Sequence, residues 1–256
     1  MKRVGSPKTT AYIKTLRVLG VVLFPAAWLI IKYGFSVSDK FLPGPVDVFQ
    51  SAFDLSPSII SHFAASAMRL GSGVVLGALF GIPLGAILYV NRSLRELLTP
   101  TLISMQNVPP LAVVPFFILW FGFSELGKFL IVFLSVAVNL AMYGVRALNG
   151  LEPRYRTMIK SYGLNRLSAL RLFFVPYILS VCLPTLRYVL SVSVGLVLFS
   201  ELLGAQVGLG YLIQTARSTF SMSLVFLVAL ISTVLYVLFD AALVAFWRRA
   251  FPWSVS

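Results

Sequence analysis

The sequence predicts an all-α integral membrane protein with about six transmembrane helices. Of its 256 residues, 59% are hydrophobic and only 11% are charged, and the mean hydropathy is +0.92. A soluble domain carries about 25% charged residues. A soluble core of this length could not bury so much apolar surface, so we expect lipid to solvate most of the chain.

Six apolar runs have the length that a helix needs to cross the hydrocarbon layer. We expect them to form a single transmembrane domain over residues 1–256. The expected spans are 18–35, 68–90, 102–121, 129–145, 183–200 and 224–246. The first run follows a basic segment, as a signal peptide would. No small-residue cleavage site follows it, so we interpret it as an uncleaved helix.

The cations predict the orientation of these spans. With six spans both termini lie on one side, and most of the Lys and Arg gather there: Lys2, Arg3, Lys8, Lys14, Arg17, Arg92, Arg95, Arg146, Arg154, Arg156, Lys160, Arg166, Arg171, Arg248 and Arg249. The other side carries fewer: Lys32, Lys40, Arg69, Lys128 and Arg217. The positive-inside rule therefore predicts cytoplasmic termini. The net charge of +13 is spread over loops, not gathered on the basic face that nucleic-acid binding requires.

The sequence lacks the residue patterns of most enzymes. One cysteine, Cys182, excludes an intrachain disulfide, and one histidine, His62, without a Cys/His cluster predicts no metal site. No GxxxxGK[ST] motif is present to bind a nucleotide. Glu201 and Asp240 alone do not make an intramembrane active site. We therefore expect no enzymatic activity and no cofactor on this chain.

Two spans have distinctive backbone chemistry. Gly73, Gly77, Gly81 and Gly85 recur every four residues in span 68–90. Small residues at this spacing let two helix backbones approach closely; alternatively, they reflect the general frequency of glycine in membrane helices. Span 102–121 contains Pro109, Pro110 and Pro115, so we expect it to be kinked or unwound.

The largest cytoplasmic insertion, residues 146–172, predicts an amphipathic helix. Pro153 suits a first helical turn, and Tyr155, Met158, Ile159 and Tyr162 fall on one face at i, i+3, i+4 and i+7. Gly163 is a plausible stop. Two interpretations remain open: the helix lies on anionic lipid headgroups, or it inserts into a groove of a soluble partner.

Four segments of the sequence resemble one family. Residues 157–163 with Phe173-Phe174-Val175-Pro176 have the layout of the cytoplasmic "EAA" loop found in permease subunits of binding-protein-dependent ABC importers. The other three segments resemble the nitrate, sulfonate, taurine and bicarbonate permeases. They are Leu42-Pro43-Gly44-Pro45-Val46, the run 108–122 (VPPLAVVPFFILWFG), and Glu201-Leu202-Leu203-Gly204-Ala205 with Gly208-Leu209-Gly210-Tyr211.

The resemblance implies a type I importer permease with a coupling helix between its fourth and fifth spans. The implied ATPase-coupling residues are Tyr155, Thr157, Met158, Ile159, Ser161, Tyr162 and Gly163. The implied partners are a second copy of the chain, two cytoplasmic ATPase subunits that hold ATP and magnesium, and an external solute-binding protein. One departure is that Thr157 stands where the family has an acidic residue, followed by Met158 and Ile159 in place of two alanines.

The translocation pathway is harder to assign. Gln106 and Asn107 lie in the proline-rich third span, and Ser191, Ser193 and Ser200 lie on the fifth; the serines either line the pathway or bond to neighbouring helices. Arg187 and Glu201 bracket the fifth span, where they either line the pathway or snorkel to opposite interfaces.

The resemblance leaves the solute open between small anions, such as sulfonate or nitrate, and a vitamin precursor. A self-contained secondary carrier or channel is the alternative function. Such carriers usually show inverted repeats or buried ionisable pairs, and neither is evident in the sequence. In either case we expect a multi-pass protein of the bacterial inner membrane, surrounded by lipid.

Overall fold

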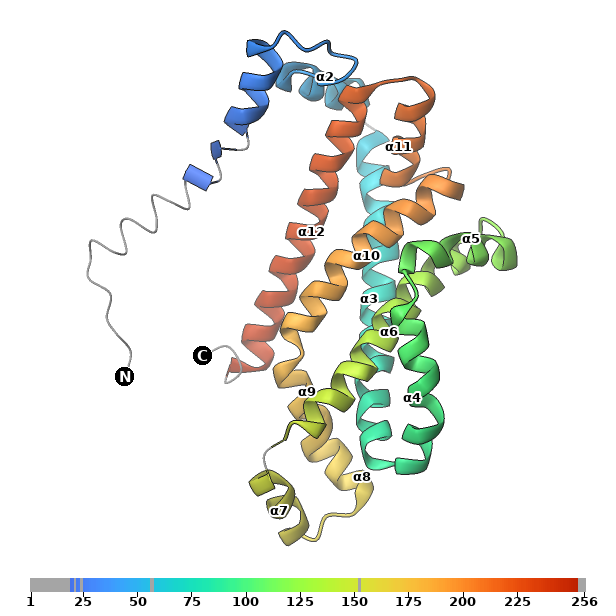
Figure 1. Ribbon diagram of the computed structural model, residues 1–256, viewed down its shortest axis with the longest axis vertical. Helices are drawn as coiled ribbons and strands as arrows, with labels where there is room; N and C mark the ends of the chain where they lie inside the picture. The colour runs from blue at the N-terminus through green and yellow to red at the C-terminus, as the bar shows by residue number, and fades with distance from the viewer. Residues whose placement is uncertain (1–18, 21, 24, 56–57, 152, 253–256) are drawn as a thin grey trace, which may run out of the picture. The chain divides into compact units, whose positions relative to one another are not determined.

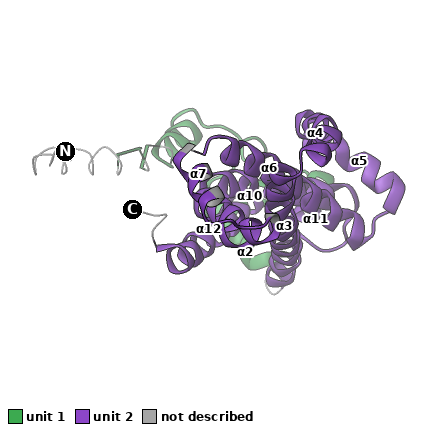
Figure 2. Cartoon of the chain, turned by 90° about the horizontal axis from the view of Figure 1, so that it is seen from below, with its two compact units in different colours: residues 1–56, 216–227 green, residues 57–215, 228–256 purple. Residues whose placement is uncertain are grey.

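The computed structural model describes residues 19–20, 22–23, 25–55, 58–151 and 153–252. All regular elements in these ranges are helical (Figure 1). The chain divides into two compact units (Figure 2): unit 1 comprises residues 1–56 and 216–227, and unit 2 comprises residues 57–215 and 228–256. Two helices, α11 (Leu209–Ser218) and α12 (Met222–Ala250), contribute residues to both units.

Within the described residues, four helices are long and apolar enough to cross a membrane. They are α3 (Ser58–Val90), α6 (Glu125–Asn149), α10 (Leu183–Gly204) and α12. They contain the expected spans 68–90, 129–145, 183–200 and 224–246. Two further helices, α4 (Arg92–Asn107) and α5 (Pro110–Phe121), together make a fifth, bent candidate. The prediction of an all-α membrane protein is confirmed.

The third expected span is not continuous. Its residues 102–121 fall on α4 and α5, whose axes differ by 102°. The break is at Val108 and Pro109. A residue before proline avoids the helical conformation, and Val108 is extended, with φ −68° and ψ 127°. Pro110 then occupies the first turn of α5, where its missing N–H costs nothing.

Unit 1 contains the first expected span in part. Val18 lies outside the described residues, whereas those described between 19 and 29 are helical and continue into a π-helical turn, η1 (Ile30–Gly34). A short helix, α2 (Pro45–Leu55), follows. The Gly44 amide donates to Asp47 Oδ2 at 2.9 Å, and Trp28 Nε1 donates to the Pro43 carbonyl at 3.1 Å. These bonds hold the segment around residues 42–47 in place.

Unit 2 is built around the packing of α3 against α6. The four glycines spaced every fourth residue on α3 are all buried and face α6. A Cβ at Gly81 would lie 2.5 Å from the Ala137 carbonyl oxygen, and one at Gly85 would lie 2.6 Å from that of Ala141. Because these contacts are to main chain, the two helices approach closely only where α3 has no side chain. At Gly73 and Gly77 the nearest atoms belong to Val132 and Val136.

Short helices extend unit 2 at one end. The segment after α6 forms α7 (Pro153–Ser161), α8 (Arg166–Ala169), the π-helical turn η2 (Leu170–Phe174) and α9 (Val175–Val181), which leads into α10. In Figure 1 this segment lies at the same end of unit 2 as the start of α4 and the end of α12. That end carries Arg92, Arg95, Arg171, Arg248 and Arg249.

Candidate functional site

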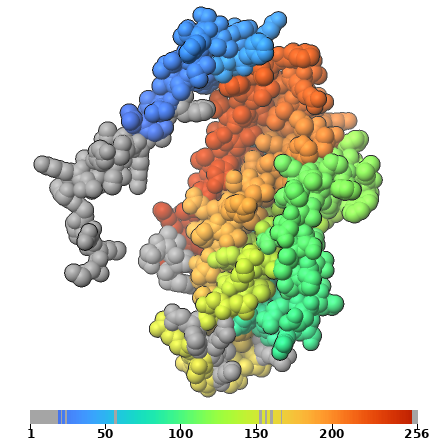
Figure 3. Space-filling view, viewed as in Figure 1, coloured from blue at the N-terminus to red at the C-terminus, as the bar shows by residue number. Residues whose placement is uncertain are grey.

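Helix α7 lies at the surface of unit 2 (Figure 3). It ends at Ser161, and Gly163 follows with φ +61°. An added Cβ at Gly163 would meet nothing within 4 Å, so its left-handed backbone conformation, rather than crowding, is what favours glycine there. The Tyr162 amide donates to the Met158 carbonyl at 3.1 Å and completes the last turn.

The apolar stripe of α7 is anchored at its start and open further along. The Tyr155 ring is half-buried, and its centroid lies 6.3 Å from that of Phe173 on η2. The guanidinium carbon of Arg154 lies over the Tyr155 ring, 5.0 Å from its centroid. Met158 is 42% exposed and Tyr162 is 74% exposed. Beyond Tyr155, the described part of the stripe is therefore open at Met158 and Tyr162.

The remaining coupling candidates belong to the same short helix. Thr157 and Ser161 are both exposed, and the Ser161 hydroxyl donates to the Thr157 carbonyl at 3.0 Å. The side chain of Ile159 lies outside the described part of the structure.

A second candidate region lies at the break between α4 and α5. Gln106 Nε2 donates to Asn139 Oδ1 of α6 at 2.9 Å, and Arg146 Nη1 donates to Gln106 Oε1 at 3.3 Å. A cavity of about 310 Å³ adjoins Gln106 and Asn139, and apolar side chains such as Phe117 and Ile131 also line it. Asn107 is exposed and takes no part in these bonds. Gln106 is thus placed beside a cavity.

The expected pathway residues on α10 do not share one face. Ser191 is exposed, whereas Ser193 and Ser200 are buried. Ser200 donates to the Val197 carbonyl at 2.8 Å, and Ser193 Oγ has no partner among the described residues. Glu201 is completely buried. In this structure Ser193, Ser200 and Glu201 therefore line no accessible surface, and Glu201 does not snorkel.

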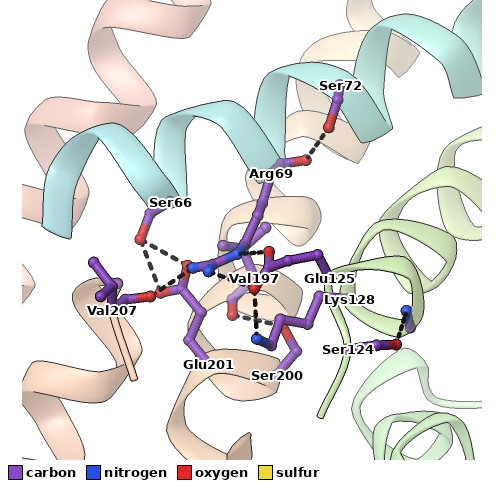
Figure 4. A network of polar contacts seen from close by, with 12 residues as sticks. Ser66, Arg69, Ser72, Ser124, Glu125, Lys128, Val197, Ser200, Glu201 and Val207 are labelled. Atoms are coloured by element: carbon purple, nitrogen blue, oxygen red, sulfur yellow. Dashed lines mark hydrogen bonds and ion pairs between the residues drawn. The ribbon is translucent and has the colours of Figure 1, made fainter. Parts of the chain in front are cut away.

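Glu201 is instead the centre of a polar network (Figure 4). The Ser66 hydroxyl lies 2.8 Å from both carboxylate oxygens, and Arg69 Nη1 donates to Oε1 at 2.7 Å. The Gly210 amide donates to Oε2 at 2.9 Å, and the Leu209 amide donates to Ser66 Oγ at the same distance. The carboxylate therefore joins α3, α10 and the start of α11.

Arg69 extends this network to α6. Its Nε and Nη2 donate to the Glu125 carboxylate at 2.6 and 2.8 Å, while Nη1 also donates to the Val207 carbonyl at 2.8 Å. Lys128 Nζ donates to Glu125 Oε1 at 2.9 Å. Two cations therefore face two carboxylates, as buried charges require. Arg69 and Lys128, which the sequence analysis counts on the external side, lie in α3 and α6, and their side chains are 12% and 7% exposed.

The network explains the glycines at positions 208 and 210. A Cβ at Gly208 would overlap the Glu201 carboxylate, and one at Gly210 would overlap the Leu198 carbonyl oxygen. The Gly208 amide donates to His62 Nδ1 at 3.0 Å, and the His62 ring stacks on Tyr211 at 5.7 Å. Glycines here let the chain turn close enough to bring its amides to buried acceptors.

Sequence reasoning missed Ser66, Arg69 and Glu125 because their partners are distant in the chain. One signal was available: a charged residue beside an apolar run needs a partner of opposite charge. Applied to Arg69 and Glu201, this rule would have suggested their pairing. It also applies to Arg187 and Asp240, which form an ion pair with Nε and Oδ1 2.6 Å apart.

Comparison with known proteins identifies the family. Residues 73–251 match the family described as "Binding-protein-dependent transport system inner membrane component". The chain belongs to this family. As a member it is the membrane-spanning permease subunit of an ABC importer, as the motifs around Gly163 and Glu201 predicted. Among the described residues, no group of three or more His, Cys, Asp or Glu side chains could hold a metal ion.

Two curated relatives of the permease cover most of its length. It is 28% identical to the taurine transport system permease protein TauC of Escherichia coli, over 97% of this chain and 91% of that one. It is also 28% identical to the putative aliphatic sulfonates transport permease protein SsuC of Bacillus subtilis, over 97% and 90% of the two chains.

A third relative is named for a different kind of solute. The permease is 27% identical to the formylaminopyrimidine transport permease protein ThiX of Halalkalibacterium halodurans, over 83% and 85% of the two chains. Among solved structures, a chain of the inward-facing MetNI methionine ABC transporter is similar with a TM-score of 0.59 and 16% identity, over 73% of this chain and 95% of that one. This likeness supports the type I permease fold.

Proposed function

We propose that two copies of this permease form the pathway for a small solute, and that each copy receives mechanical input from a cytoplasmic ATPase subunit through α7. An external solute-binding protein delivers the solute. ATP and magnesium bind to the ATPase, and this chain holds neither. Both termini lie in the cytoplasm of a bacterial cell, and the spans are surrounded by the lipid of the inner membrane.

The open apolar stripe of α7 carries this proposal. Its first residue, Tyr155, is fixed by Phe173 and Arg154, so the helix has a defined position on unit 2. Met158 and Tyr162 remain exposed, and an amphipathic helix is stable when such a face is buried in a groove. A rigid connection through η2 and α9 to α10 would transmit movement of α7 to a membrane span.

The distribution of charge supports the orientation. The end of unit 2 that holds α7 carries the basic residues of the α3–α4 turn and of the end of α12. Cytoplasmic loops are enriched in such residues. The opposite end holds the network around Glu201, whose charges are paired.

The relatives support a small solute that carries a sulfonate group. Two of them are named for taurine and aliphatic sulfonates. The formylaminopyrimidine permease supports a vitamin precursor as the second candidate solute.

The deciding experiment places one charge on the stripe. Met158→Asp introduces a carboxylate where a cleft would have to bury it, so we expect loss of ATPase co-purification and at least a tenfold loss of ATP-driven uptake in proteoliposomes. Thr157→Asp is the matched control: it adds the same charge to the same helix, at the position where the family has its acid. This control should retain both properties.

Two results would contradict the proposal. Retention of ATPase and uptake by Met158→Asp would show that the stripe is not a docking surface. ATP-independent uptake by the purified chain alone would identify a carrier or channel. A helix that merely lies on headgroups predicts weaker membrane contact in Met158→Asp without any change in ATPase binding.

A further inference from the structure

An ion pair joins α10 and α12 away from the network around Glu201. Arg187 Nε donates to Asp240 Oδ1 at 2.6 Å, and Nη2 donates to Oδ2 at 2.7 Å. This is the bidentate geometry that fixes the plane of a guanidinium. Asp240 is largely covered, with 16% of its side chain exposed, whereas 48% of the Arg187 side chain is exposed.

The pair lies within the apolar layer. Asp240 precedes Arg248, at the basic end of α12, by about 12 Å of helix. The hydrocarbon core of a bilayer is about 30 Å thick, so at this distance from the basic end of α12 Asp240 lies inside it. A charged side chain at this depth normally faces protein or water, because exposure to hydrocarbon costs several kcal/mol.

Arg187 is part of a polar stripe on α10. Its exposed neighbours at helical spacing are Tyr188, Ser191 and Gly195, and an added Cβ at Gly195 would meet nothing within 4 Å. The exposed face of α12 is different, since it presents apolar side chains such as Val234, Val237 and Leu238. The exposed face of α12 therefore has the apolar composition of a lipid-facing surface. The polar stripe of α10 lacks this composition.

Part of the Arg187 guanidinium remains available to donate hydrogen bonds to a ligand. The bonds to Asp240 use Nε and one hydrogen of Nη2, and Nη1 forms no bond with any described residue. A guanidinium has five N–H donors in one plane. The unused edge can therefore donate two hydrogen bonds to a planar or tetrahedral oxyanion while Asp240 holds the group in place.

We propose that the stripe of Arg187, Tyr188, Ser191 and Gly195 lines the water-filled pathway, and that Arg187 binds the oxyanion group of the solute there. This rests on the proposed function, since the pathway forms between two copies of the chain. The carboxylate of Asp240 neutralises Arg187 when no solute is present, which keeps the cation stable in the membrane. It also weakens anion binding, so the solute is released onward instead of being trapped.

The test uses charged thiol reagents as probes and needs no knowledge of the natural solute. The native Cys182 is buried and is replaced by Ala. In this background Ser191→Cys places one thiol on the stripe, and Leu238→Cys places one on the apolar face of α12. The permease, assembled with its ATPase, is then treated with methanethiosulfonates bearing either an ethylsulfonate or an ethyltrimethylammonium group.

We expect the cysteine at position 191 to react with both water-soluble reagents and the one at position 238 with neither. The anionic reagent should react faster relative to the cationic one than it does with a free thiol. Replacing the pair by Arg187→Gln with Asp240→Asn keeps the site neutral and similar in shape. It should lower the anionic-to-cationic rate ratio severalfold, because position 191 lies one helical turn, about 6 Å, from Arg187. Asp240 cancels part, but not all, of the effect of the guanidinium charge on the two reagents. Arg187→Lys keeps the charge and should retain most of the preference.

Three outcomes would overturn the proposal. Absence of reaction at position 191 would place the stripe against lipid or a closed protein interface. A cysteine at position 238 that reacts as fast as one at position 191 would show that the exposed faces of α10 and α12 do not differ in their access to water. An unchanged rate ratio in the double variant would show that Arg187 does not attract anions, as would be the case if it paired with an acid of the second copy. Failure of the proposed coupling would be recognised separately, from loss of the ATPase in the same preparation.

Discussion

Replacing Gly81 by Ala tests the close packing of α3 against α6 with a single added methyl group. The new Cβ would lie 2.5 Å from the Ala137 carbonyl oxygen and 2.9 Å from the Ala137 Cα. A carbon–oxygen contact is normally about 3.3 Å or longer. The helices must therefore separate by about 0.8 Å at this point, because a main-chain carbonyl in a helix cannot rotate away. Neighbouring contacts at Gly77 and Gly85 oppose that separation.

The same substitution at Gly71 is the matched control. Gly71 is on the same helix, but its added Cβ would lie 3.3 Å from the ring edge of Phe239, which can move. Both substitutions gain up to about 1 kcal/mol of helix propensity, so this gain cancels in the comparison. Overpacking costs about 1–3 kcal/mol, and it applies fully only to Gly81→Ala. We therefore expect Gly81→Ala to be less stable than Gly71→Ala by about 2 kcal/mol.

Thermal unfolding of the detergent-solubilised protein measures this difference. At about 2–4 °C per kcal/mol for a chain of this size, the Tm of Gly81→Ala should lie roughly 4–8 °C below that of Gly71→Ala. Gly81→Leu, with a larger side chain, should prevent assembly. Equal Tm values for the two alanine variants would refute the conclusion that α3 and α6 are in backbone contact.

Two further predictions concern the network around Glu201 and the end of α7. Glu201→Gln removes a buried charge from Arg69 and should lower the free energy of unfolding by about 3 kcal/mol. Glu125→Gln should cost less, because this side chain is 65% exposed and water can solvate the groups that it leaves. Equal Tm shifts for the two variants would contradict the central role of Glu201. Gly163→Val places a β-branched residue at φ +61° and should cost at least about 1–2 kcal/mol locally, reducing ATPase binding in pull-down. Asparagine tolerates the left-handed conformation, so the Gly163→Asn variant should retain the ATPase. Similar losses of ATPase binding in the Val and Asn variants would show that the backbone conformation at position 163 is not what binding requires.

Local sequence patterns predicted those structural elements that depend on interactions between residues close together in the chain. The apolar run 224–246 lies within one helix, α12, because a segment in lipid must satisfy its own backbone hydrogen bonds. The prolines at 109 and 110 predicted a disrupted third span, since proline cannot donate a hydrogen bond, although they did not predict a bend as large as 102°. The i, i+3, i+4, i+7 pattern and Gly163 predicted α7 together with its end.

The pairing of charges could not be predicted from the sequence in this way. Ser66 and Arg69 each lie more than 130 residues from Glu201 along the chain, and no periodicity relates them to it. Composition indicated only that a charge in an apolar span needs a partner. For this reason the sequence left Glu201 open between the pathway and a membrane interface, whereas the structure shows it buried, accepting hydrogen bonds from Ser66, Arg69 and the Gly210 amide.

The sequence by itself determined that this protein lies in a membrane, to which family it belongs and which segments are helical. Hydropathy, helix breakers and short motifs suffice for this because they act over one or two helical turns. The tertiary structure decided which residues meet. It placed the α3 glycines against the α6 backbone, closed the network of Arg69 and Glu201, and left the Arg187 guanidinium half exposed beside Asp240. These features depend on the distance and rotation between helices, which are set by packing across the whole of unit 2 and not by any one segment.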